Sequence, residues 1–162
     1  MERVIVVASY IFSRYQEAFS SRIDEMKLHK LLYFAQRESL IQNKEPLFEE
    51  LFQAWKYGPV MVCVREKYAS NLLNEEMSKE SVERNKNVFD YIFEHYAKKD
   101  SWSLSLLTHG EISWNNARQN IKTGDSCSNE MALDDIKKDA ERIKQRRIKI
   151  KNYLSSQNGQ NK

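Results

Sequence analysis

The apolar residues of this sequence recur at the spacing of helices. Between residues 3 and 19, apolar residues at positions 4, 8, 11, 12, 15 and 19 share one face of a helix, with polar residues opposite. Similar stripes predict further helices over about residues 24–41, 59–73, 82–97, 102–108 and 134–154. The predicted fold class is therefore mainly α, in a single compact multi-helix domain.

The second of these helices has the clearest start. Asp24 is a good N-cap residue, because its carboxylate can accept a hydrogen bond from a backbone N–H of the first turn. Apolar side chains at positions 28, 31, 32 and 35 would face the core. The pattern places the polar residues largely outside the core; these are Lys27, Lys30, Gln36 and Arg37.

Residues 51–60 contain the sharpest break in the helical pattern. Gly58 can adopt backbone angles that other residues avoid, and Pro59 has the preset φ of a first helical residue. We therefore expect a tight corner that carries Trp55 and Tyr57, with a new helix starting at Pro59. Residues 47–57 remain open between one short helix and a short extended segment or hairpin, because short apolar runs do not distinguish the two.

The last predicted helix, about residues 134–154, is the most basic part of the chain. Its apolar seam is interrupted by Arg147, and residues 136–154 hold eight basic residues against two acidic ones. One interpretation is a docked or coiled helix with a solvated basic face; the other is a contact surface for an acidic partner or nucleic acid. The basic face consists of Lys144, Arg146, Arg147, Lys149 and Lys151. Residues 155–162 are expected to form a disordered tail, so the predicted domain spans residues 1–154.

Composition narrows the function classes only a little. The 162 residues suffice for one domain with a core, and the net charge of +3 is too small to indicate nucleic-acid binding by itself. Cys63 and Cys127 have no metal or redox spacing, and no cofactor is expected. No apolar run has the length of a membrane span, and no signal-peptide cleavage site follows the apolar start of the chain. The expected location is the cytoplasm.

A polar cluster near residue 110 could suggest a hydrolase. Thr108, His109, Glu111 and Arg118 nominally supply a nucleophile, a base and an acid. Adjacent residues on a helix point about 100° apart, however, so Thr108 and His109 would not pair as nucleophile and base. We expect these groups to make structural hydrogen bonds, and we expect no catalytic residues.

Four segments in order and spacing resemble the Panacea, or SocA-like, domain family, which includes phage-associated GepA-type proteins. They are residues 27–36 (KLHKLLYFAQ), 46–48 (PLF), 54–60 (AWKYGPV) and 107–118 (LTHGEISWNNAR). The resemblance covers roughly residues 4–120. The motif positions expected to be structural are Lys30, Tyr33, Gln36, Gly58, Pro59, His109, Glu111 and Trp114.

The resemblance implies a small, mostly helical, non-enzymatic antitoxin, encoded on a prophage or mobile element, that neutralises a cognate toxin by direct binding. The expected contact residues at the corner are Trp55, Lys56, Tyr57, Met61 and Arg65, extended by the basic face of the last helix. Two alternatives stay open: a nucleic-acid-binding regulator that uses this basic face, and an adaptor that delivers a toxin to a cytosolic protease. The chain departs from the family pattern at Val62, where Pro is usual, and at Arg65, where Tyr is usual.

Overall fold

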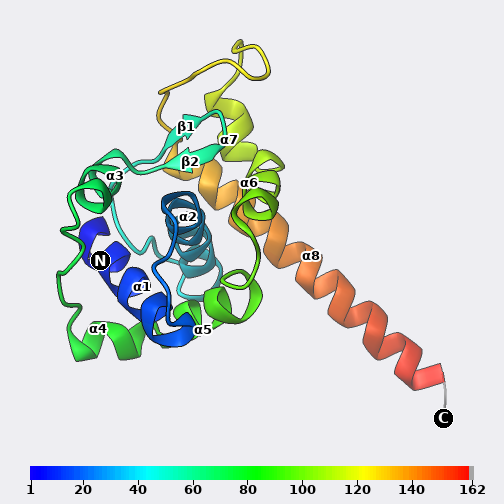
Figure 1. The fold of residues 1–162 in the computed structure, drawn as a ribbon. Helices are drawn as coiled ribbons and strands as arrows, with labels where there is room; N and C mark the ends of the chain where they lie inside the picture. Colours follow the sequence, from blue (N-terminus) through cyan, green and yellow to red (C-terminus); the bar gives the residue numbers. More distant parts are fainter. Residues whose placement is uncertain (161–162) are drawn as a thin grey trace.

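The computed structural model describes residues 1–160 and confirms a mainly α fold in a single compact domain (Figure 1). One antiparallel hairpin interrupts the succession of helices. The elements are α1 (Val4–Phe19), α2 (Glu25–Gln42), β1 (Gln53–Trp55), β2 (Gly58–Val60), α3 (Val62–Ala69), α4 (Lys79–Arg84), α5 (Lys86–His95), α6 (Ser101–His109), α7 (Ile112–Ala117) and α8 (Leu133–Gln160).

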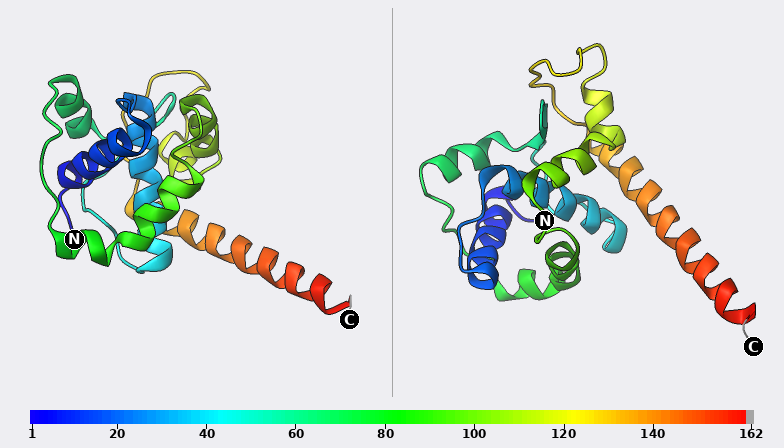
Figure 2. Two further views of the ribbon diagram at one scale, coloured as in Figure 1. Left: turned by 60° about the horizontal axis from the view of Figure 1, so that its bottom comes forward. Right: turned by 45° about the vertical axis from the view of Figure 1, so that its right-hand side comes forward.

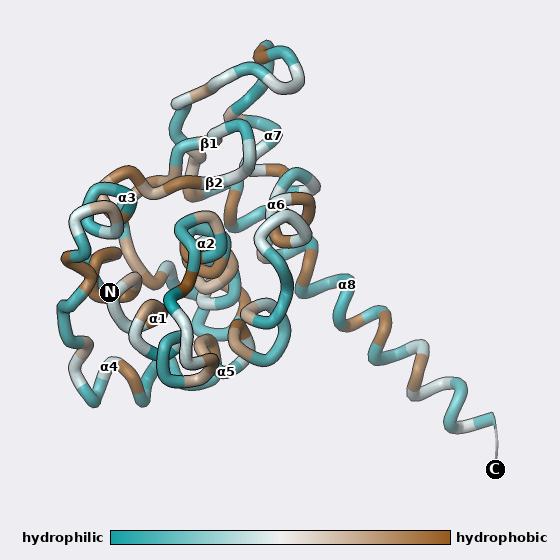
Figure 3. The backbone as a smooth tube through the Cα atoms, in the orientation of Figure 1, coloured by the Kyte–Doolittle hydropathy of each residue, from teal (hydrophilic) through white to brown (hydrophobic). Residues whose placement is uncertain are grey.

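Helix α2 lies at the centre of the domain, with α1, α3, α5, α6, α8 and β2 packed around it. Asp24 caps it as predicted, accepting a hydrogen bond from the backbone N–H of Lys27 at 2.8 Å. Every residue from Lys27 to Ser39 is buried. In Figure 3 the apolar segments of α1 and α2 lie inside the ring formed by the other elements.

The prediction that the polar residues of α2 lie outside the core is therefore wrong. Lys27, Lys30, Gln36 and Arg37 are at most 8% exposed. Gln36 shows why, because its amide donates to the carbonyl of Phe48 at 2.8 Å and accepts from the N–H of Leu47 at 2.7 Å. A buried polar group is tolerated when it is hydrogen-bonded. Here the partners of Gln36 lie outside its own helix, 11 and 12 positions further along the chain.

The extended alternative for the corner is confirmed, as a two-residue hairpin. Trp55 pairs with Gly58 and Gln53 with Val60, which leaves Lys56 and Tyr57 as the turn. The prediction of a helix starting at Pro59 is wrong, since Pro59 lies inside β2 and the next helix begins at residue 62. A proline can occupy such an edge strand because it need not donate to a ladder there.

The prediction of one helix over residues 82–97 also needs correction. The helix expected over residues 82–97 is two helices, α4 and α5, separated at Asn85. Ser78 caps α4 and Asp100 caps α6, each through its side chain. Trp102 lies two residues after this cap and is 59% exposed.

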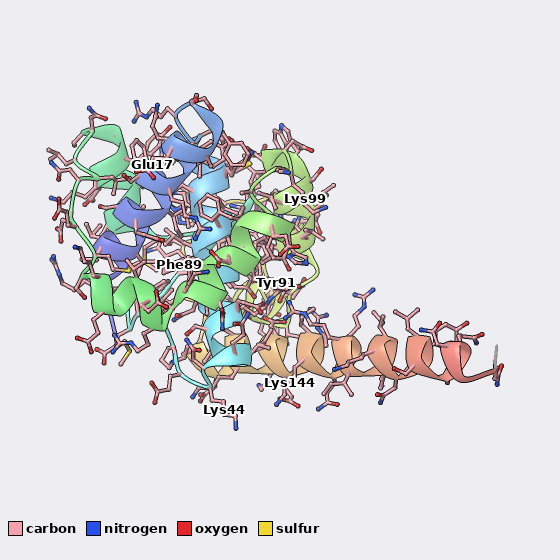
Figure 4. The ribbon with its side chains drawn as sticks, turned by 90° about the horizontal axis from the view of Figure 1, so that it is seen from below. Glu17, Lys44, Phe89, Tyr91, Lys99 and Lys144 are labelled. Atoms are coloured by element: carbon pink, nitrogen blue, oxygen red, sulfur yellow. The ribbon has the colours of Figure 1, made fainter. Side chains whose placement is uncertain are left out.

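Helix α8 begins inside the domain and ends far outside it. Ile136 and Ala140 are buried against the body, whereas Ile150 and Leu154 are more than half exposed. Figure 2 shows the second half of the helix projecting from the body in both views, and Figure 4 shows its side chains on all sides beyond Lys144. Residues 155–160 continue the helix instead of forming the predicted disordered tail, and residues 161–162 lie outside the described part.

Within residues 1–160, no helix combines the length and apolar character that a membrane crossing requires. The described residues also contain no cluster of three or more His, Cys, Asp or Glu side chains that could hold a metal ion.

Candidate partner-binding surface

The hairpin is held against the helices by a close backbone approach at Gly58. Its φ is +109°, and a Cβ at this position would lie 2.4 Å from Thr108 Oγ1 and 2.6 Å from Lys30 Cε. The Lys30 ammonium donates to the carbonyl of Pro59 at 3.2 Å, and Ser105 Oγ donates to the carbonyl of Tyr57 at 2.5 Å. Glycine is required here for both its backbone angle and its size, and the hairpin is fixed on α2 and α6.

Three exposed side chains and the half-buried Trp55 make an aromatic and basic surface at this hairpin. We name it the aromatic corner; its members are Trp55, Tyr57, Arg65 and Trp102. Tyr57 is 44% exposed and packs edge-on against Trp102, with ring centroids 5.2 Å apart. The guanidinium of Arg65 lies 5.1 Å from the ring of Trp55. Lys56 is exposed beside them, on the turn.

Sequence reasoning missed one member of this surface and included one residue that is not on it. Trp102 lies in the first turn of α6, four residues before the exposed Leu106, and this spacing was the available signal for an outward face. Met61 is 2% exposed, so its side chain belongs to the core and offers no contact to a partner.

A pocket of about 510 Å³ opens beside the aromatic corner. Its walls include His29 and Lys30 from α2, Lys56 from the turn and Arg65 from α3, with Glu25 as the acidic residue. Burial lowers the pKa of Lys30 to about 7 and also lowers the pKa of His29. The pKa of Glu25 is lowered by the imidazole of His29 and by Arg65. The wall therefore gathers four side chains that can donate hydrogen bonds against one carboxylate, and burial reduces the positive charge of Lys30 and His29.

A buried polar network joins α2 to α7 and α8 on the other side of the hairpin. Arg37 Nη1 donates to Glu111 Oε1 at 2.5 Å, and the hydroxyl of Tyr33 lies 3.0 Å from Glu111 Oε2 and 3.1 Å from Asp139 Oδ2. Asp139 also accepts from the N–H groups of residues 112 and 113 at 2.6 and 2.9 Å, and so caps α7 from a different helix. Burial raises the pKa of Glu111. This network stabilises the arrangement of three helices.

The other polar groups near residue 110 make separate contacts, and His109 Nε2 makes no hydrogen bond within the described residues. Thr108 Oγ1 donates to the carbonyl of Ser105 at 2.7 Å, and the ring of His109 stacks on Trp114 with centroids 4.2 Å apart. The indole N–H of Trp114 donates to the carbonyl of Trp55 at 2.9 Å, and Arg118 donates to the carbonyl of residue 54. The motif residues of α6 and α7 thus support the hairpin.

The basic face of α8 is only partly available. Arg147 makes two 2.9 Å hydrogen bonds to the carboxylate of Glu38, and its guanidinium lies 4.4 Å from the ring of Tyr91. Its role is therefore to join α8 to the body, which explains its place in the apolar seam. Within the described residues, no ion pair forms at Lys144, Arg146, Lys149 or Lys151.

The fold and the surface together define a small, mainly helical domain organised around one buried helix and one fixed hairpin. The chain belongs to the antitoxin SocA-like, Panacea domain family, whose pattern matches residues 28–115, just over half of its length. That range begins at the fourth residue of α2, holds the hairpin and α3 to α6, and ends inside α7. Membership supports an antitoxin role in general and suggests a non-enzymatic, regulatory protein.

A curated relative agrees with the family assignment. The chain is 41% identical over 49 residues to Antitoxin SocA from Caulobacter vibrioides (strain NA1000 / CB15N). The matched segment is 30% of this chain and spans about a quarter (26%) of the relative's length. No solved structure matches the chain.

Proposed function

We propose that this chain is a non-enzymatic, cytoplasmic antitoxin that neutralises a cognate toxin by direct contact, and that it is encoded on a prophage or mobile element. The family supplies the general role. The observation that carries direct contact is the aromatic corner, where Tyr57 and Trp102 are 44% and 59% exposed beside Arg65. Tyr, Trp and Arg are the residues most enriched among those that dominate binding energy at protein interfaces.

The corner is also rigid, which favours binding. Its hairpin is fixed by the close approach at Gly58 and by hydrogen bonds from Lys30 and Ser105. A surface held in one conformation loses little entropy when it binds, so more of the contact energy appears as affinity. The polar motif residues of α6 and α7 are engaged in internal contacts, and this supports a binding role rather than a catalytic one.

A growth-rescue experiment with matched variants tests this proposal. The product of the adjacent reading frame would be induced with and without this chain, and complexes would be purified at two salt concentrations. Tyr57→Ser should weaken the complex about 30-fold or more, the effect of losing about 2 kcal/mol at a central contact. Tyr153→Ser is the control, because Tyr153 is also exposed but lies on the projecting part of α8. Equal rescue and affinity for both variants would remove the corner from the interface.

The charge of α8 favours a second candidate function, nucleic-acid binding. From residue 142 to residue 160 the helix has six basic residues and no acidic one. Contacts from Lys144, Arg146, Lys149 and Lys151 to four phosphates predict that log K falls with log salt at a slope of about −3.6 on duplex DNA. A double reversal to Glu at Lys149 and Lys151 should halve that slope; an affinity for DNA that does not change with salt excludes this candidate.

A further inference from the structure

The pocket beside the aromatic corner contains polar groups that the fold leaves incompletely satisfied. Lys30 is 1% exposed, yet its ammonium, which has three donors, makes one hydrogen bond among the described residues, to the carbonyl of Pro59. His29 is 2% exposed; its Nδ1 accepts from the N–H of Met61, so its Nε2 carries the proton of the neutral ring. That Nε2 makes no well-formed hydrogen bond: Glu25 Oε1, which also accepts from Arg65, lies 3.5 Å from it.

Buried donors without acceptors are costly, and a native structure that retains them needs a reason. Here two such side chains come from consecutive positions of α2 and line the same pocket. Two cations, Lys56 and Arg65, reach its wall from other elements. Arg65 Nη1 already donates to the one carboxylate of the lining, Glu25, at 2.8 Å, and its other N–H groups remain for a further acceptor. Three elements therefore supply donors to a single cavity, in which Glu25 is engaged by Arg65 and Lys30 has no carboxylate partner among the described residues. An anionic ligand would supply that partner.

Most of the remaining wall is apolar and aromatic, and Ser126 and Cys127 from the loop before α8 complete it. Met26, Trp55, Tyr57 and Val60 lie in the lining. A volume of about 510 Å³ is within the range of roughly 300–1,000 Å³ that small-ligand pockets occupy. A bare inorganic anion would fill the donor side and leave the apolar side in contact with water. The pocket suits a ligand that has an anionic end and a flat apolar body.

We propose that this pocket binds an organic carboxylate, with the carboxylate at Lys30, His29 and Arg65 and the apolar body against Trp55. The same chemistry is available from a free small molecule and from an acidic side chain next to an aromatic one in a polypeptide. The proposal does not rest on toxin binding, because its ligand and its readout require no toxin.

A titration of the full chain with two matched probes tests the charge requirement. Phenylacetate has the carboxylate and the apolar ring, and phenylacetamide has the same shape without the charge. The measured signal is the NMR chemical shift of the Trp55 indole N–H, with those of Trp102 and Trp114 as internal controls. A charged hydrogen bond contributes about 1.5–3 kcal/mol, so phenylacetate should bind about tenfold or more tightly than phenylacetamide.

Variants then assign the binding to this pocket. Arg65→Gln changes an exposed side chain and should weaken phenylacetate binding several-fold without unfolding the domain. Lys67→Gln is the control, because Lys67 is an exposed cation on the same helix and is not in the pocket lining. Lys30→Met removes the buried ammonium and should abolish binding; the dispersed NMR spectrum of each variant reports whether it is folded.

A third probe separates the two sources of the carboxylate. N-acetyl-aspartyl-phenylalanine amide has blocked ends, so its aspartate side chain is its one charge. Saturation by phenylacetate assigns a free small molecule, and saturation by the blocked peptide alone assigns an acidic side chain of a polypeptide. Equal binding of phenylacetate and phenylacetamide, an unchanged affinity in Arg65→Gln, or no saturable shift with any probe would overturn the proposal.

Discussion

Replacing Gly58 by alanine tests whether the hairpin is fixed as described. The substitution adds one methyl group at a residue whose φ is +109°, a region that costs side-chain-bearing residues about 1–3 kcal/mol. The new Cβ would lie 2.4 Å from Thr108 Oγ1 and 2.6 Å from Lys30 Cε, both in side chains that are at most 1% exposed. Overpacking of this kind costs about 1–3 kcal/mol more.

The chain provides a matched control for the backbone part of this cost. Gly124 has a φ of +89°, and no atom lies within 4 Å of the position of an added Cβ. Gly124→Ala should therefore carry only the backbone cost, and the steric cost is the difference between the two variants. We expect Gly58→Ala to lose about 2–6 kcal/mol of unfolding free energy in total, a large share of the 5–15 kcal/mol that is typical of a domain.

Urea denaturation followed by circular dichroism measures both values, with the slope m as a check that the unfolded state is unchanged. If Gly58→Ala destabilises the domain no more than Gly124→Ala does, then the close approach of the hairpin to α2 and α6 does not restrict the side chain at position 58. The inference that the hairpin holds the aromatic corner in one conformation would then be unsupported.

Three further predictions concern buried charges. Glu111→Ala should cost about 3–5 kcal/mol of stability in urea denaturation, because it leaves the buried Arg37 guanidinium without its carboxylate; a loss under 1 kcal/mol would contradict the network. Arg147→Ala should cost about 1–3 kcal/mol, because the carboxylate of Glu38 stays buried, and proteolysis should then cut α8 faster; unchanged stability and cleavage would contradict the anchor. Burial lowers the pKa of Lys30 to about 7, so above that pH the unfolded chain binds one more proton than the folded one. Relative to Lys30→Met, the stability of the unmodified chain should therefore rise between pH 8 and 9, by about 1.4 kcal/mol per unit at most, and equal slopes would contradict this.

The sequence alone was sufficient to predict those elements whose ends are determined by residues a few positions apart. The bounds of α1, the cap at Asp24 and the corner at Gly58 all follow from periodicity, a capping side chain or backbone freedom within a few residues. The hairpin was one of two alternatives that the pattern allowed. The prediction of a helix start at Pro59 was wrong because the fixed φ of proline suits an edge strand as well as the first residue of a helix.

The errors share a physical cause, which is partners from distant segments. Gln36 and Arg37 look solvent-facing by periodicity, but Phe48 and Glu111 provide the hydrogen bonds that allow burial. Arg147 is part of the basic face predicted from the sequence, but in the structure it donates to Glu38, which lies 109 positions earlier in the chain. The pocket at the aromatic corner gathers residues from α2, the turn and α3, and no spacing in the sequence indicates that they meet.

Co-expression with a toxin tests the proposal that this chain neutralises a toxin by direct contact through the aromatic corner. The toxin encoded by the adjacent reading frame would be co-expressed with the wild-type chain, with Tyr57→Ser or with Tyr153→Ser, while growth and co-purification are followed. We expect rescue and a stable complex with the wild-type chain and with Tyr153→Ser, and loss of both with a folded Tyr57→Ser. Rescue without a complex, or full rescue by Tyr57→Ser, would contradict the proposal.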